Sequence, residues 1–125
     1  MTLTMFQERV RRWVLDCFGK EIAQDTTERS YRFLEEALEL VQSCNCTKEE
    51  ALKLVDYVYS RSIGEVTQEL GGTMVTLAAL ASANGLSLKG CSVSEIKRCE
   101  AKTEKIRAKH FSKDPNIRSS LPGKT

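Results

Sequence analysis

Apolar residues recur every three or four positions along most of this chain, which is the spacing of amphipathic α-helices. Proline occurs only at Pro115 and Pro122, and no segment alternates apolar and polar residues as a half-buried strand would. The sequence therefore predicts an all-α fold, a helical bundle of about five helices followed by a polar tail. The expected helices cover approximately residues 4–18, 25–43, 47–62, 65–84 and 92–110.

The expected helix ends carry capping signals. Three pairs of residues have the spacing of a capping box, in which the N-cap side chain and the third helical residue exchange hydrogen bonds. These pairs are Asp25 with Glu28, Thr47 with Glu50, and Ser92 with Glu95. Gly19 and Gly85 follow the first and fourth helices, where glycine readily takes the left-handed conformation that ends a helix.

Length and composition predict one all-α domain over residues 1–110 and a flexible basic tail over residues 111–125. The apolar stripes of the expected helices present more apolar surface than one small core can bury, so we expect a homo-oligomer, a dimer or a tetramer. No apolar run approaches the roughly 20 residues of a membrane helix, and the N-terminus lacks a signal-peptide core. An odd number of cysteines, five, without zinc spacing predicts free thiols and a cytoplasmic location.

The net charge of +2 is unevenly distributed. Residues 1–84 contain 9 Lys and Arg against 13 Asp and Glu, whereas residues 85–125 contain 10 against 4. A basic C-terminal part raises the possibility of a nucleic-acid-binding protein. We rank this third, because the body is acidic and no aromatic residues alternate with the basic ones.

Two expected helices carry carboxylates with few cations to pair them. The second helix contains Glu35, Glu36 and Glu39, and the fourth contains Glu65 and Glu69. Like charges three or four residues apart on a helix repel each other by a few tenths of a kcal/mol, about 0.2–0.5 per pair. A solvated acidic face is the ordinary explanation. However, no Lys or Arg occurs between residues 61 and 89, and small residues continue the acidic side of the fourth helix. A divalent cation held by oxygen ligands, Mg²⁺ or Mn²⁺, would relieve this repulsion.

The order of these acids resembles a family motif. Glu35-Glu36-x-x-Glu39, followed about thirty residues later by Glu69 in Gln68-Glu69-Leu70-Gly71-Gly72, is similar to the E-E-x-x-E and E-x-x-D motifs of MazG-type all-α nucleoside triphosphate pyrophosphohydrolases. The stretch from Lys102 to Lys109 also resembles a basic segment near the end of small phage and bacterial members. The resemblance implies Mg²⁺-dependent hydrolysis of a (deoxy)nucleoside triphosphate to the monophosphate and pyrophosphate, in dimers or tetramers of helical bundles.

The resemblance also implies roles for individual residues. Glu36, Glu39 and Glu69 would hold Mg²⁺, and Glu35 would be a second-metal ligand or a general base. Trp13 or Tyr31 would stack on the base, unless each is an ordinary core or interface aromatic. Four basic residues would hold the triphosphate, unless they form a solvated face. They are Lys102, Lys105, Arg107 and Lys109.

One position departs from the family pattern. The motif's Asp falls on Gly72, so one metal ligand of the family is missing. Glu65 lies four residues before Glu69, and we expect it to reach the same cation, or a water molecule to complete the coordination shell. The alternative is a non-catalytic module that binds nucleotides or a partner and has lost this ligand.

Overall fold

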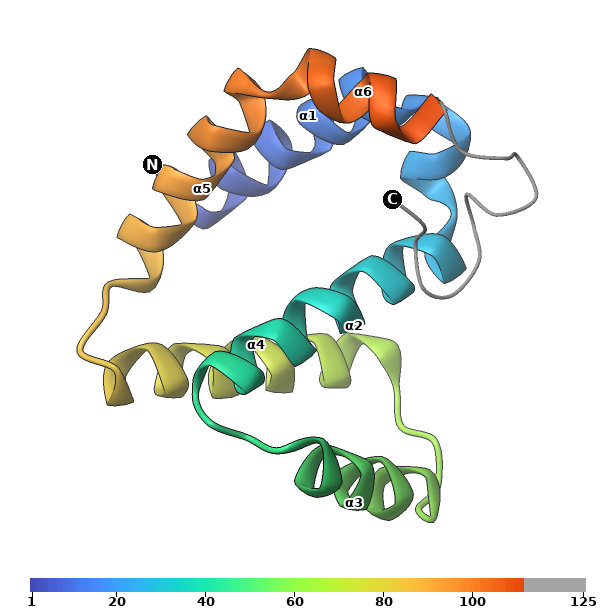
Figure 1. Cartoon of the computed structure of the whole chain (residues 1–125), viewed down its shortest axis with the longest axis vertical. Coiled ribbons are helices and arrows are strands. Elements are labelled where there is room, and N and C mark those ends of the chain that lie inside the picture. The colour runs from blue at the N-terminus through green and yellow to red at the C-terminus, as the bar shows by residue number, and fades with distance from the viewer. Residues whose placement is uncertain (112–125) are drawn as a thin grey trace. The chain divides into compact units, whose positions relative to one another are not determined.

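The computed structural model describes residues 1–111, and for Phe111 the backbone only. Within this range the chain forms six helices and no strand, which confirms the all-α prediction (Figure 1). The helices are α1 (Leu3–Gln24), α2 (Thr26–Ser43), α3 (Lys48–Tyr59), α4 (Val66–Ala83), α5 (Leu88–Ala101) and α6 (Thr103–Phe111). None of these helices has the length and apolarity needed to cross a membrane. Apart from the backbone of Phe111, the tail predicted for residues 111–125 lies outside the described residues.

Several predicted caps are confirmed. The Glu28 N–H donates to Asp25 Oδ1 at 3.1 Å, and Thr47 and Glu50 exchange both hydrogen bonds of a capping box. Gly85 follows the C-cap of α4 with a φ of 66°, a conformation that glycine adopts without a steric penalty. Gly19, with a φ of 84° and a ψ of 172°, interrupts the helical backbone of α1 where the sequence predicts a helix end, and a second helical stretch follows this kink to Gln24.

The C-terminal part differs from the expectation. α5 begins at Leu88, four residues before the expected cap at Ser92, because the Ser87 side chain accepts a hydrogen bond from the Gly90 N–H at 2.9 Å. The Ser92 hydroxyl donates instead to the Leu88 carbonyl at 2.7 Å, inside the helix. A turn at Lys102 then separates α5 from α6, so one expected helix is two.

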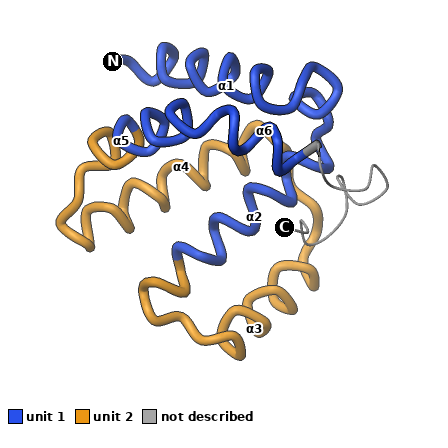
Figure 2. The backbone as a smooth tube through the Cα atoms, turned by 45° about the horizontal axis from the view of Figure 1, so that its top comes forward, with its two compact units in different colours: residues 1–40, 93–125 blue, residues 41–92 orange. Residues whose placement is uncertain are grey.

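The chain divides into two compact units (Figure 2). Unit 1 comprises Met1–Leu40 and the chain from Val93 onward, and therefore contains α1, most of α2, most of α5 and α6. Unit 2 comprises Val41–Ser92 and contains α3, α4 and the adjoining helix ends. Each unit has its own character.

Unit 1 has a small core around Phe18. α1 and α6 pack side by side, and the rings of Trp13 and His110 contact Phe18 edge-on, with ring centroids 6.0 and 4.9 Å away. The Arg29 guanidinium lies 5.0 Å from the centre of the same ring. Aromatic edges and a cation over a π-face are both favourable contacts, so these side chains tie α1, α2 and α6 together.

Unit 2 has no buried residue among its described positions. Large apolar side chains along α3 and α4, and on the segments that adjoin them, are exposed. They are Leu52, Leu54, Val55, Tyr57, Val58, Tyr59, Ile63, Val66, Leu70, Met74, Val75 and Leu86. Where such side chains form one surface, they usually mark an interaction site.

Candidate functional site

The acidic face of α2 in unit 1 is the first part of the candidate site. Glu35, Glu36 and Glu39 all lie on this helix, and Glu35 is paired with Arg32, whose Nη1 lies 2.7 Å from Glu35 Oε1. Arg32 also pairs with the buried Glu28, with its Nε 3.4 Å from Glu28 Oε1. The acidic run is therefore partly compensated at Glu35, the residue expected to act as a base or second-metal ligand.

α5 adds a fourth carboxylate, that of Glu95, which the sequence did not indicate as a site residue. The pKa of Glu36 is raised, first by loss of solvation and then by the negative charges of Glu39, Glu95 and Glu35. Glu36 is still solvent-exposed, so neighbouring groups displace only part of its water. Glu95 appeared in the sequence only as a capping partner; because it lies inside α5, its side chain is available to face α2.

Arg98 of α5 places a positive charge near these carboxylates. Its Nε donates to Glu95 Oε1 at 2.9 Å, and this pairing holds the pKa of Glu95 below its usual range. The positive charge of Arg98 also opposes the rise in the pKa of Glu36. Arg98 therefore lies within electrostatic reach of two of the acids. This proximity depends on the approach of α5 to α2, which no local pattern in the sequence predicts.

The four basic residues expected to hold a triphosphate separate into two groups. The charge of Lys102, at the turn between α5 and α6, contributes to lowering the pKa of Glu95, so Lys102 lies within electrostatic reach of this carboxylate. Arg107 Nε donates to the Asp16 carbonyl of α1 at 2.9 Å, and its Nη1 lies 3.6 Å from Glu104 Oε1. Arg107 thus joins α6 to α1. Two further bases, Lys105 and Lys109, are exposed on α6.

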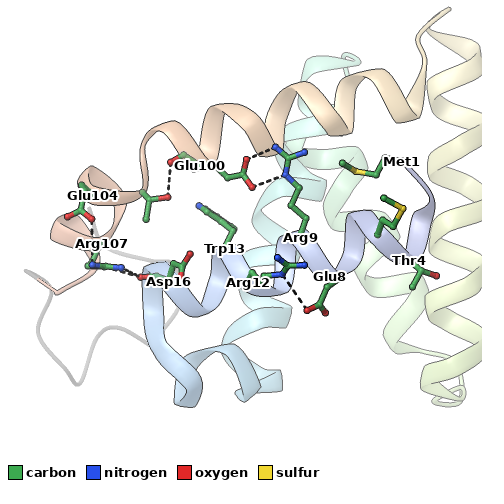
Figure 3. Close-up of a pocket in the computed structure, with 12 residues that line it drawn as sticks. Met1, Thr4, Glu8, Arg9, Arg12, Trp13, Asp16, Glu100, Glu104 and Arg107 are labelled. Carbon is green, nitrogen blue, oxygen red and sulfur yellow. Dashed lines mark hydrogen bonds and ion pairs between the residues drawn. The ribbon is translucent and has the colours of Figure 1, made fainter.

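Trp13 has structural contacts in unit 1. Its indole N–H donates to the Cys99 carbonyl at 3.2 Å, and its ring packs against Phe18. The side chain is half-buried and lines an open groove of about 960 Å³ between α1 and the α5–α6 segment (Figure 3). Tyr31, the other aromatic considered for base stacking, is half-buried on α2.

The charges in this groove are internally matched. Arg9 donates to both oxygens of Glu100, at 2.8 and 2.6 Å, and Arg12 lies 3.6 Å from Glu8 (Figure 3). Arg107 contacts α1 in the same view, as described above. Since each of these guanidiniums already has a partner, the groove carries little surplus charge to attract an anion.

Unit 2 supplies the second acidic pair. Glu65 is the N-cap of α4, and its carbonyl accepts a hydrogen bond from the Glu69 N–H at 2.9 Å, so Glu65 lies one helical turn before Glu69, as expected. Glu69 is in the first turn of α4, and its carboxylate folds back over Gly64. Around Gly72, an added Cβ would meet no atom within 4 Å, so this position has room for a side chain.

The donor set of these acids consists of carboxylate oxygens alone, the ligand type that Mg²⁺ and Mn²⁺ favour. Within residues 1–111, no three His, Cys, Asp or Glu side chains form a group arranged to hold a metal ion. The carboxylates of α2 and α5 thus influence one another through their charges without converging on a point.

All five cysteines are free thiols, as predicted, so none is committed to a disulfide.

No protein-family model matches this chain, and neither does a curated protein or a solved structure. The case for a function therefore depends on the chemistry of the chain's own residues.

Proposed function

We propose that the protein is a cytoplasmic nucleoside triphosphate pyrophosphohydrolase, which uses Mg²⁺ to convert a (deoxy)nucleoside triphosphate to the monophosphate and pyrophosphate. The observation that supports this most is the acidic face of α2. There Glu36 has two acidic neighbours on its own helix and a third, Glu95, on α5, and its pKa is raised by loss of solvation first and by these negative charges second. Like charges kept together at a cost to stability are a feature of functional sites.

In this proposal Glu36, Glu39 and Glu69 are the metal ligands, with Glu35 or Glu95 available as a further ligand or a base. A bound Mg²⁺ would neutralise charge on the phosphate oxygens and make a water molecule more nucleophilic. Because the pKa of Glu36 is raised, protons compete with a cation for this carboxylate more strongly than at an ordinary Glu. Metal affinity should therefore fall as the pH is lowered.

Arg98 and Lys102 are the cations best supported as triphosphate contacts, because both act electrostatically on Glu95. A guanidinium can bind two phosphate oxygens at once, and Arg98 would exchange its contact with Glu95 for the substrate. Lys105 and Lys109 are exposed and accessible to a ligand. Arg107 is the weakest of the expected contacts, since it joins α6 to the Asp16 carbonyl.

The test combines turnover with metal binding. Wild type should release pyrophosphate from at least one triphosphate in a panel, and only when Mg²⁺ or Mn²⁺ is present. Calorimetric titration should show Mn²⁺ binding that Glu39→Gln abolishes. The loss of Mn²⁺ affinity in Glu39→Gln should exceed the roughly 10–100-fold loss caused by removing a residue that only supports a metal ligand. Glu49→Gln, an exposed carboxylate in the first turn of α3, is the matched control and should bind Mn²⁺ as wild type does. Unchanged binding in Glu39→Gln would exclude that ligand.

Gly72 favours a second candidate, a non-catalytic nucleotide-binding module. The space around Gly72 accommodates an added side chain, so Gly72→Asp tests whether the missing ligand limits activity. If Glu65 substitutes for it, Glu65→Gln should lower turnover strongly and Gly72→Asp should restore part of it. A silent Glu65→Gln in an active enzyme would assign the remaining coordination to water. Triphosphate binding without any turnover would favour the module.

A further inference from the structure

α4 has the composition of a helix that is enclosed on all sides. It is the most apolar of the six helices, and Glu69 is its single charged residue. A helix of this kind is normally surrounded by other helices. Within one copy of the chain, however, only Leu77, Leu80 and Ala81 of α4 are partly covered, and all its other residues are exposed.

The apolar surface left open on α3, α4 and their adjoining segments is large enough for a stable dimer. The twelve large apolar side chains named above for unit 2 are between 39% and 100% exposed. A fully exposed side chain of this kind presents on the order of 100 Å² or more, so together they leave on the order of 1,000 Å² uncovered. A stable pair of proteins buries about 800 Å² on each partner. One contact with a second copy would therefore have enough area.

The absence of charge on α4 favours an identical helix as the partner. No Lys or Arg occurs between Arg61 and Lys89, and no acid follows Glu69 within the helix. Residues 70–83 therefore neither attract a charged partner nor repel a second copy of themselves. In a two-fold symmetric dimer the same patch lies on both sides of the contact, so only a patch without like charges pairs readily with itself.

One side of α4 has a shape suited to such self-pairing. Gly71, Val75 and Ala78 follow one another at intervals of four and three residues, so they share a face of the helix. Val75 is 70% exposed, and an added Cβ at Gly71 would meet no atom within 4 Å. A large side chain between two small ones forms a ridge beside hollows, and packed helices interlock through such surfaces.

We propose that α4 is the dimer contact of this protein, and that the α4 of a second copy packs antiparallel against it along Gly71, Val75 and Ala78. A two-fold axis near Val75 brings the two valines together at the centre and sets Gly71 of one copy opposite Ala78 of the other. The small residues let the helices approach closely, and Leu70 beside this face adds to the apolar area covered. An antiparallel pair also places the opposite ends of the two helix dipoles side by side.

A leucine at residue 71 distinguishes a free helix from a covered one. In a free α4, Gly71→Leu replaces a poor helix former and enters open space, so the thermal midpoint should rise by about 4 °C. In the proposed dimer the same side chain would occupy the space of the neighbouring helix. We therefore expect Gly71→Leu to raise the dimer dissociation constant at least about tenfold, measured by sedimentation equilibrium on the full chain. Gln7→Leu, at an exposed position of α1, is the matched control and should leave this constant unchanged.

Hydrogen exchange locates the contact directly. At a protein concentration about ten times the dissociation constant, the backbone amides of α4 should exchange about tenfold more slowly than in dilute protein, with a smaller change in α1. A wild type that stays monomeric would overturn the proposal. So would α4 amides that exchange equally at both concentrations, because the contact would then lie elsewhere. An unchanged dissociation constant in Gly71→Leu would exclude this face of α4.

Discussion

The polar side chains of the two units find their hydrogen-bond partners in different ways. In unit 1, hydrogen bonds from Arg9, Trp13 and Arg107 join residues that are 91, 86 and 91 positions apart in the chain. In unit 2, the polar contacts of α3 are its own caps and turns, and Asn84 reaches Cys44 only at 3.8 Å, a long contact to sulfur. Unit 1 is connected by tertiary contacts, whereas unit 2 consists of helices with local hydrogen bonds.

The two units also differ in how much of their apolar surface is covered. Unit 1 buries Cys17 and Ile96 completely or nearly so, and encloses two polar residues, Glu28 and His110. Unit 2 buries no described residue, yet α3 and α4 carry large apolar side chains. Apolar surface in water costs about 25 cal/mol per Å², so these helices gain stability from any surface that covers them. We propose that a second copy of the chain does so, in the dimer or tetramer that the sequence predicts.

The largest expected effect is therefore on assembly. Light scattering should give wild type a mass that is a multiple of the 14.0 kDa monomer. Leu70→Asp in α4 should lower the association free energy by about 4 kcal/mol, the cost of losing a strong interface hot spot. The measured mass should then fall towards that of the monomer at micromolar concentration.

Leu3→Asp is the matched control in unit 1. The two leucines are comparably exposed, 72% for Leu70 and 64% for Leu3, so an unspecific effect of adding charge would be equal for both. We expect Leu3→Asp to leave the mass unchanged. A monomeric wild type, or equal dissociation by both substitutions, would contradict the assignment of the interface to unit 2.

A smaller effect, on the free energy of unfolding, is expected when the buried ion pair of unit 1 is broken. Glu28 is only 3% exposed and lies between the guanidinium groups of Arg29 and Arg32. Removing one partner of a buried pair leaves the other charge uncompensated, which costs about 3–5 kcal/mol. Because both arginines retain some exposure, Glu28→Gln should lower the free energy of unfolding by about 3 kcal/mol, measured by denaturant titration.

Glu8→Gln is the corresponding exposed change. Glu8 also pairs with two arginines, Arg11 and Arg12, but its side chain is 44% exposed. Exposed ion pairs contribute about 0–1 kcal/mol. Equal losses from Glu8→Gln and Glu28→Gln would mean that unit 1 is no better packed around Glu28 than at its surface.

The sequence predicted the helices of both units well because their signals are local. The capping box of Thr47 and Glu50 depends on residues three apart, and Gly85 ends α4 through its own backbone. The prediction failed where two local signals competed. Ser87 and Ser92 are both plausible N-caps, and only the structure shows that the helix begins at the first. The turn at Lys102 has neither proline nor glycine to mark it.

The candidate site was predictable only where it lies on one helix. Glu35, Glu36 and Glu39 are neighbours because helical spacing makes them so. The approach of Glu95 and Arg98 depends on how α5 packs, which no short-range pattern encodes. The contact between Gly64 and Glu69 is a matter of a side-chain rotamer, and so it was invisible in the sequence.

The smallest expected effect on the free energy of unfolding concerns Glu36. Removing its charge should stabilise the protein, whereas removing that of Glu28 should destabilise it. The folded state raises the pKa of Glu36 above its ordinary value of 4.5, so it binds more protons there than the unfolded chain does. By linkage, stability falls as the pH rises from about this value through the folded pKa. Above that window the charge of Glu36 destabilises the fold, and below it the cost disappears.

Glu36→Gln should therefore stabilise the protein at pH 7. Repulsion between like charges one helical turn apart suggests a gain of about 0.3 kcal/mol, and at pH 3 the variant and wild type should be equal. Denaturant titrations at both pH values measure this. Glu49→Gln removes a carboxylate from the first turn of α3, where the helix dipole favours negative charge, so it should be neutral or destabilising. If Glu36→Gln destabilises the protein at pH 7 as Glu28→Gln does, Glu36 is part of the packed structure of unit 1. A stabilising result would mean that the chain keeps this carboxylate at a cost, as a binding group would require.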